Sequence, residues 1–186
     1  MRCFNLVTAG IALAASVTGL AQGPTYRQGR TPTEQEIKAW DIAIGPAGKE
    51  LPPGSGTAKV GATVFVQKCR ACHGATATEG PARRLVGGKE TLDTDKPVRT
   101  TWSWPYATTI FDSINRAMPL NRGGTLSADE VYALTAYLLY LNEIIQETDV
   151  IDAKSLPKID MPYRSHYHPP NPVWKPGMKN PMGYYP

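Results

Sequence analysis

The chain has 186 residues, of which 41% are hydrophobic and 19% are charged, and this suits one modest globular domain better than two. Its formal net charge of +4 is mild. Proteins that bind nucleic acid usually carry a clustered basic face. We therefore expect no nucleic-acid partner.

Residues 1–21 have the pattern of a secretory signal peptide. An apolar run follows Arg2 and ends in small residues, which fits cleavage after Ala21. The run is too short, and too rich in Thr, Ser and Gly, for a membrane anchor. No Arg-Arg pair precedes it. We therefore expect export by the general pathway to the periplasm, with no membrane span in the mature chain.

Residues 22–56 form a predicted N-terminal extension. Thr33 and Glu36 have the spacing of a capping box, which predicts a short helix. The following stretch, GPAGKELPPGSG, is expected to be a loop because of its Gly and Pro content.

Residues 57–150 carry the strongest helical patterns. Thr57 is the expected cap of a helix that runs to the cysteines, and WPYATTIFDSINRAMP predicts a helix that ends at Pro119. Ser127 and Glu130 form a second capping box. The helix that they begin has an apolar stripe at steps of three and four, formed by Val131, Leu134, Leu138, Leu141 and Ile145.

Residues 151–186 are predicted to form an extended, Pro-rich C-terminal arm. Eight prolines lie between residues 157 and 186, and proline this dense disfavours regular helix and sheet. We favour a strap that docks on a partner, since a preformed extended chain loses little entropy on binding. An arm folded back over its own domain and a disordered tail are the alternatives.

The stretch KCRACHG contains Cys69, Cys72 and His73 in a C-x-x-C-H motif. In an exported protein this motif is typical of covalent attachment of a c-type haem. Each thiol adds across one vinyl group of the haem to form a thioether. His73 is then held beneath the iron as an axial ligand. Since the chain has one such motif, we expect one haem c.

Other chemistries fit these residues less well. A thioredoxin-like C-x-x-C follows a strand, whereas a helix is expected before this motif. Zinc needs four ligands, and the other histidines, His166 and His168, are only two residues apart in the Pro-rich arm. A disulfide across two intervening residues would be strained.

Met118 is the candidate for the sixth iron ligand. It follows a predicted helix, and Pro119 helps to fix the loop that presents its sulfur. Core filling is the ordinary role of a methionine. The methionines of the arm, Met161, Met178 and Met182, are weaker candidates. A His/Met ligand pair raises the reduction potential, which suits an electron acceptor.

Trp104 and Tyr106 are candidates for contacts with the haem propionates, because buried Trp N–H and Tyr O–H groups usually find a polar partner. Trp102 and Arg116 are weaker candidates for the same contact. Ordinary packing under a loop is the alternative for all four.

The stretches GATVFVQKCRACHG, AMPL and LSADEVYALTAYLLYLN resemble class I cytochromes c. The resemblance implies an all-α fold, in which three core helices surround a covalent haem. It also implies that the first and last helices cross where Gly61 and Phe65 meet Tyr137. The matching position for the carbonyl that accepts the His73 Nδ1–H is Pro81.

A closer resemblance covers most of the mature chain. WPYATT, LPKIDMPYR and AMPL are similar to stretches of the cytochrome subunit of sulfane dehydrogenase, from bacterial thiosulfate oxidation. The resemblance implies a molybdenum-cofactor dehydrogenase as partner, with electrons passed on to a downstream cytochrome or oxidase. Two alternatives stay open: a freely diffusing carrier that serves a terminal oxidase, and a haem enzyme or sensor with an open iron site.

Overall fold

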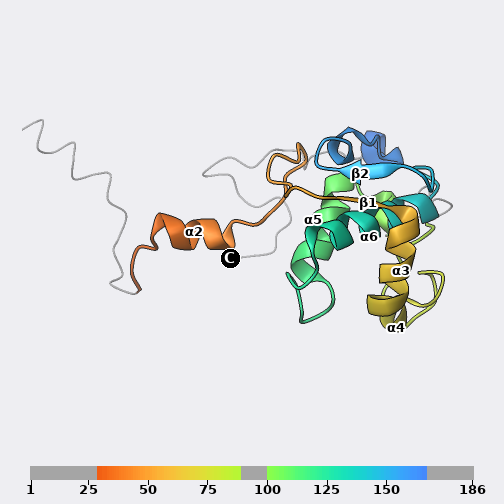
Figure 1. Ribbon diagram of the computed structural model, residues 1–186, viewed down its shortest axis with the longest axis horizontal. Helices are drawn as coiled ribbons and strands as arrows, with labels where there is room; N and C mark the ends of the chain where they lie inside the picture. Colours follow the sequence, from red (N-terminus) through yellow and green to blue (C-terminus); the bar gives the residue numbers. More distant parts are fainter. Residues whose placement is uncertain (1–28, 89–99, 167–186) are drawn as a thin grey trace, which may run out of the picture. The chain divides into compact units, whose positions relative to one another are not determined.

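The computed structural model describes residues 29–88 and 100–166, which fall in two compact units, Met1–Asp41 and Ile42–Pro186 (Figure 1). The predicted signal peptide lies outside the described residues. No helix in the described ranges is long and apolar enough to cross a membrane.

The described part of the first unit holds the short helix α2, Glu34–Trp40. Its capping box is present as predicted: the Thr33 side chain accepts from the Glu36 N–H, and the Glu36 side chain accepts from the Thr33 N–H. The hydrogen bond that Arg30 donates is the main cause that lowers the pKa of Glu36 to about 2. This helix buries none of its residues.

The second unit is mainly helical, which confirms the predicted all-α, class I cytochrome c fold. Its helices are α3 (Ala58–Lys68), α4 (Arg70–His73), α5 (Ala107–Ala117) and α6 (Ala128–Leu141). The predicted caps at Thr57 and Ser127 both form, the second with Glu130 as a complete capping box. The last helix ends at Leu141, earlier than its apolar stripe suggests, because Asn142 caps it.

Helices α3 and α6 cross through the contact that the family resemblance implies. A Cβ added to Gly61 would lie 1.9 Å from the carbonyl oxygen of Ala133. One turn later, the rings of Phe65 and Tyr137 have centroids 5.4 Å apart. The absence of a side chain at Gly61 therefore lets the two backbones touch, and the aromatic pair flanks the crossing.

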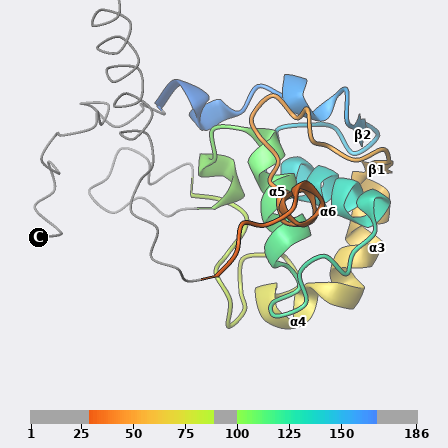
Figure 2. The same ribbon diagram turned by 90° about the vertical axis from the view of Figure 1, so that its left-hand side faces the viewer.

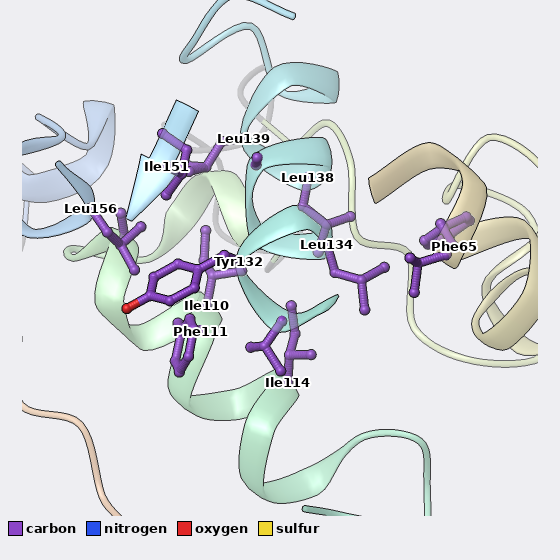
Figure 3. Close-up of a cluster of buried hydrophobic side chains, with 14 of the residues drawn as sticks. Phe65, Ile110, Phe111, Ile114, Tyr132, Leu134, Leu138, Leu139, Ile151 and Leu156 are labelled. Carbon is purple, nitrogen blue, oxygen red and sulfur yellow. The ribbon is translucent and has the colours of Figure 1, made fainter. Parts of the chain in front are cut away.

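The core lies between α3, α5 and α6. Figure 3 shows Phe111 of α5 beside Tyr132 of α6, whose ring centroids are 4.6 Å apart, and Leu134 and Leu138 on the side of α6 that faces Phe65. Burial of such side chains contributes about 1.5–3 kcal/mol each. The predicted stripe on α6 is therefore the centre of this core, with Val131, Leu134 and Leu138 buried.

A two-stranded antiparallel sheet, which the all-α prediction did not include, pairs the segment before α3 with the segment after α6. Strand β1, Ser55–Thr57, pairs with β2, Val150–Asp152, with Gly56 opposite Ile151. The chain before β1 also packs here: Ile44 and Leu51 contact the core. The compact unit therefore begins at Ile42 and not at the predicted boundary of residue 57.

The prediction of an extended arm from residue 151 onwards does not describe residues 151–166. After β2 come two short 3₁₀ helices, η3 (Leu156–Lys158) and η4 (Pro162–His166). Ile151, Leu156 and Met161 are almost fully buried. Proline is compatible with the first turn of a helix, so these prolines do not prevent packing of the apolar residues between them. Residues 167–186 of the predicted arm lie outside the described residues.

Candidate haem site

The C-x-x-C-H motif lies where α3 ends and α4 begins. The Cys69 N–H donates to the Phe65 carbonyl, which continues the helix, and the Cys69 carbonyl then accepts from both Cys72 and His73. Gly74 ends this turn with a φ of +81°, and a Cβ there would lie 1.7 Å from the carbonyl oxygen of Glu79. The short helix therefore places the two thiols and the imidazole within one turn.

Both cysteines are free thiols with different surroundings. Cys72 is exposed and Cys69 is half-buried. Burial raises the pKa of the Cys69 thiol to about 11. Cys69 is thus expected to be protonated at neutral pH until its sulfur is modified.

The His73 imidazole is oriented by a backbone carbonyl. Its Nδ1 lies 2.8 Å from the carbonyl oxygen of Arg83. With Nδ1–H as the donor, Nε2 is left with a free lone pair for a metal. Arg83 therefore takes the place that the sequence assigned to Pro81. The loop explains the difference: the Ala82 N–H bonds to the Cys72 carbonyl, which brings the residue after Ala82 opposite the ring.

Met118 is the C-cap residue of α5, and its N–H donates to the Ile114 carbonyl at 3.1 Å. The chain beyond it turns back, with a 2.8 Å bond from the Gly124 N–H to the Asn115 carbonyl. A Cβ at Gly123 would lie 2.2 Å from the Arg116 carbonyl oxygen. The loop that carries Met118 is thus fastened to the end of its own helix.

One mainly apolar cavity, of about 250 Å³, brings together Cys69, Cys72, His73 and Met118. Its wall is formed by side chains from α3, α5 and α6 and from the loops between them: Phe65, Leu85, Ile110, Ile114, Leu134 and Leu138. Lys68 and Arg83 are the charged residues among those that line it. Two thiols, an imidazole and a thioether around an apolar cavity fit the attachment and ligation of a haem.

Trp104 lines this cavity, whereas Trp102, Tyr106 and Arg116 are not among the residues that line it. Arg116 forms an ion pair with Asp112 at 2.5 Å. The guanidinium of Arg164 lies 5.2 Å from the centroid of the Tyr106 ring. Thr101 and Ser113 line the cavity but were missed, because neither belongs to a sequence motif.

The Asn142 side chain forms hydrogen bonds to three segments of the chain. Its side-chain amide donates to the Leu138 carbonyl at 2.8 Å, to the Thr101 hydroxyl at 2.9 Å and to the Leu85 carbonyl at 3.3 Å. Its Oδ1 accepts from the Gly87 N–H at 3.2 Å. Asn142 is only 7% exposed. The end of α6 is thereby hydrogen-bonded to Leu85 and Gly87 and to Thr101, and of these Leu85 and Thr101 line the cavity.

The described residues contain no group of three or more His, Cys, Asp or Glu side chains that could hold a bare metal ion.

Comparisons with known proteins agree with this geometry. A family model described as cytochrome c oxidase, cbb3-type, subunit III matches residues 56–138. No curated protein matches the chain. The crystal structure of the sulfane dehydrogenase SoxCD from Paracoccus pantotrophus contains a similar chain, with a TM-score of 0.70 and 36% sequence identity. The match covers 79% of this chain and 73% of that one. The chain therefore belongs to the class I c-type cytochromes and, among them, resembles the cytochrome subunit of sulfane dehydrogenase.

Proposed function

We propose that this chain is a monohaem cytochrome c that accepts electrons as a subunit of a molybdenum-dependent sulfur-compound dehydrogenase and passes them to the respiratory chain. The observation that carries the haem assignment is the presence of Cys69, Cys72, His73 and Met118 around one apolar cavity. The similarity to a chain of a sulfane dehydrogenase supports the choice of partner.

In this proposal each residue has a separate task. Cys69 and Cys72 would hold the haem through thioethers, and His73 would bind the iron through Nε2 while its Nδ1–H donates to the Arg83 carbonyl. Met118, which lines the same cavity, would supply its sulfur as the second iron ligand. The haem supplies one-electron redox chemistry, and the apolar wall keeps water from the iron, which favours a higher reduction potential.

Trp104 is the side chain that we propose for contact with a haem propionate, since it lines the cavity. Its indole N–H is a hydrogen-bond donor, and a carboxylate is a good acceptor for it. Tyr106 stays a prediction for this contact and is the weaker of the two, because its ring lies beneath Arg164.

We place the protein in the periplasm after cleavage behind Ala21. The signal-peptide pattern of residues 1–21 supports this location. Attachment of haem to two thiols is also in keeping with an exported protein.

The haem assignment is tested on the protein purified from its native host. The mass should equal that of the processed chain plus one haem, and the absorption spectrum should be that of a low-spin haem with His and Met ligands. A colourless protein with the mass of the bare chain would contradict the assignment.

The partner is tested by co-purification. A tagged full-length chain should retain a second polypeptide that contains molybdenum. If the tagged chain purifies alone, the alternative of a freely diffusing carrier gains support. If a second polypeptide is retained, removal of residues 167–186 is the next test: it should weaken the retention of a resident partner and change little for a diffusing carrier. The deletion starts at residue 167 so that the buried Leu156 and Met161 stay in place.

A further inference from the structure

The loop that follows the C-x-x-C-H motif is held by hydrogen bonds of Ala82, Arg83, Leu85 and Gly87, and the last two residues both bond to the Asn142 side chain. The Ala82 N–H bonds to the Cys72 carbonyl at 2.9 Å, and the Leu85 N–H bonds to the Ala77 carbonyl at 2.7 Å. Between them, the Arg83 carbonyl lies 2.8 Å from Nδ1 of His73. Two further bonds join the Leu85 carbonyl and the Gly87 N–H to the side chain of Asn142, at the end of α6.

The Leu85 carbonyl accepts three hydrogen bonds, which join the loop to Asn142 and to Thr101. It accepts from the Asn142 side-chain amide at 3.3 Å, from the Thr101 hydroxyl at 2.6 Å and from the Thr101 N–H at 3.2 Å. The Asn142 amide also bonds to that same hydroxyl at 2.9 Å. Thr101 is only 3% exposed. Buried polar networks whose members are all hydrogen-bonded rigidify their surroundings, so this one fixes the backbone two residues from Arg83.

We infer that Asn142 is a positioning residue for the iron ligand: by holding Leu85 and Gly87, it fixes the Arg83 carbonyl opposite His73. The inference rests on the proposed function, in which His73 binds a haem iron. A carbonyl that accepts from a ligating imidazole makes the imidazole more basic and fixes its orientation. A more basic ligand stabilises ferric over ferrous iron, so the network lowers the reduction potential.

The test is the substitution Asn142→Ala in the full-length haem protein. We expect the reduction potential to rise, so that the ratio of ferric to ferrous protein at a fixed applied potential falls several-fold. Hydrogen exchange at the Gly87 amide should accelerate at the same time, because this N–H loses its acceptor. Spectroelectrochemistry measures the potential, and NMR measures the exchange.

Thr135→Val is the matched control. The Thr135 hydroxyl is also buried on α6 and donates to the Val131 carbonyl at 2.7 Å, but Thr135 is not among the residues that line the cavity. This variant should lose stability without a change in potential. An equal change of potential in both variants would overturn the inference, because it would show a general effect of loosening α6.

A second pair of variants applies if Asn142→Ala does not fold. Thr101→Val removes the hydroxyl that joins Asn142 to Leu85, whereas Thr101→Ser keeps it. Because Thr101 also lines the cavity, the two variants are compared with each other, and the potential of Thr101→Val should lie above that of Thr101→Ser. An unchanged potential in folded Asn142→Ala, or equal potentials in the two Thr101 variants, would overturn the inference. A wild-type protein without a His-ligated haem would instead contradict the proposed function itself.

Discussion

The backbone of Gly61 touches the backbone of Ala133, and this contact fixes how closely α3 and α6 can approach. Since a Cβ at Gly61 would lie 1.9 Å from the Ala133 carbonyl oxygen and 2.7 Å from the Tyr137 Cβ, there is no room for a side chain. The motif cysteines follow directly at the end of α3, so this crossing also positions them against α6.

Gly61→Ala is therefore expected to destabilise the protein by about 1–3 kcal/mol or more, because overpacking forces the two helices apart. Denaturant unfolding of the haem-loaded protein measures the loss. Gly45→Ala is the control, since a Cβ there meets only the Glu50 side chain at 3.5 Å. A Gly61→Ala protein as stable as the control would contradict the close contact of the helices.

Met118→Ala should open the sixth coordination position. We expect the reduction potential to fall, because a thioether ligand favours ferrous iron, and carbon monoxide to bind readily to the ferrous protein. A redox titration followed by absorption measures the potential, and absorption spectra with and without carbon monoxide measure the binding.

Met161→Leu is the control for that experiment. Met161 is buried in the core and is not among the residues that line the cavity. The Met161→Leu protein should therefore keep the wild-type spectrum and reduction potential. If Met118→Ala also keeps them, another residue is the sixth ligand. If the ferrous wild type already binds carbon monoxide, the open-site alternative is favoured.

Cys69→Ser and Cys72→Ser should each leave the haem attached through a single thioether. Denaturation of either variant followed by mass spectrometry should still show the chain plus haem, whereas the double variant should release its haem. The absorption of the reduced haem in pyridine also distinguishes one saturated vinyl group from two. A single variant that loses all covalent haem would show that its partner cysteine does not form a thioether alone.

Glu130 links the ends of two helices, and its stabilising effect should depend on pH. The hydrogen bond from Lys68 at 2.5 Å, followed by the bond from the Ser127 N–H, lowers the pKa of Glu130 below its ordinary value. A carboxyl group whose pKa is lower in the folded protein stabilises the fold above its unfolded pKa, about 4.3. The stabilisation is lost as the pH falls below that value.

Glu130→Gln should therefore reduce the free energy of unfolding at pH 7 and have a smaller effect at pH 3. Denaturant unfolding at the two pH values measures the difference. Glu147→Gln removes an exposed carboxylate and serves as the control. An equal effect of Glu130→Gln at both pH values would contradict a role for the charge.

The sequence predicted the helices because they depend on local patterns: the capping box at Ser127 and the stripe along α6 act within a few turns. It also singled out Cys69, Cys72, His73 and Met118, which the structure brings together around one cavity. The acceptor for His73 could not be predicted in this way. It depends on how the loop to Arg83 is tied to Cys72 and to Asn142, and these contacts join residues far apart in the chain.

The packing of residues 151–166 was missed for a related reason. Proline content indicates which regular structures a segment cannot form, but the burial of Leu156 and Met161 depends on the hydrophobic core against which they pack. The pairing of β2 with β1 likewise depends on residues near the other end of the domain. Composition carries no information about either contact.

The pairing of Gly56 with Ile151 joins residues near the two ends of the helical domain. Because nearly all of that domain lies between them, we expect the two strands to pair only after the intervening chain has collapsed. Contacts of such long range close late in folding, since the entropy of the loop is lost first. If the chain is exported from its N-terminal end, as proposed, Cys69 and Cys72 would cross the membrane before β2 does, so both thiols would be accessible for haem attachment before the strand pair closes.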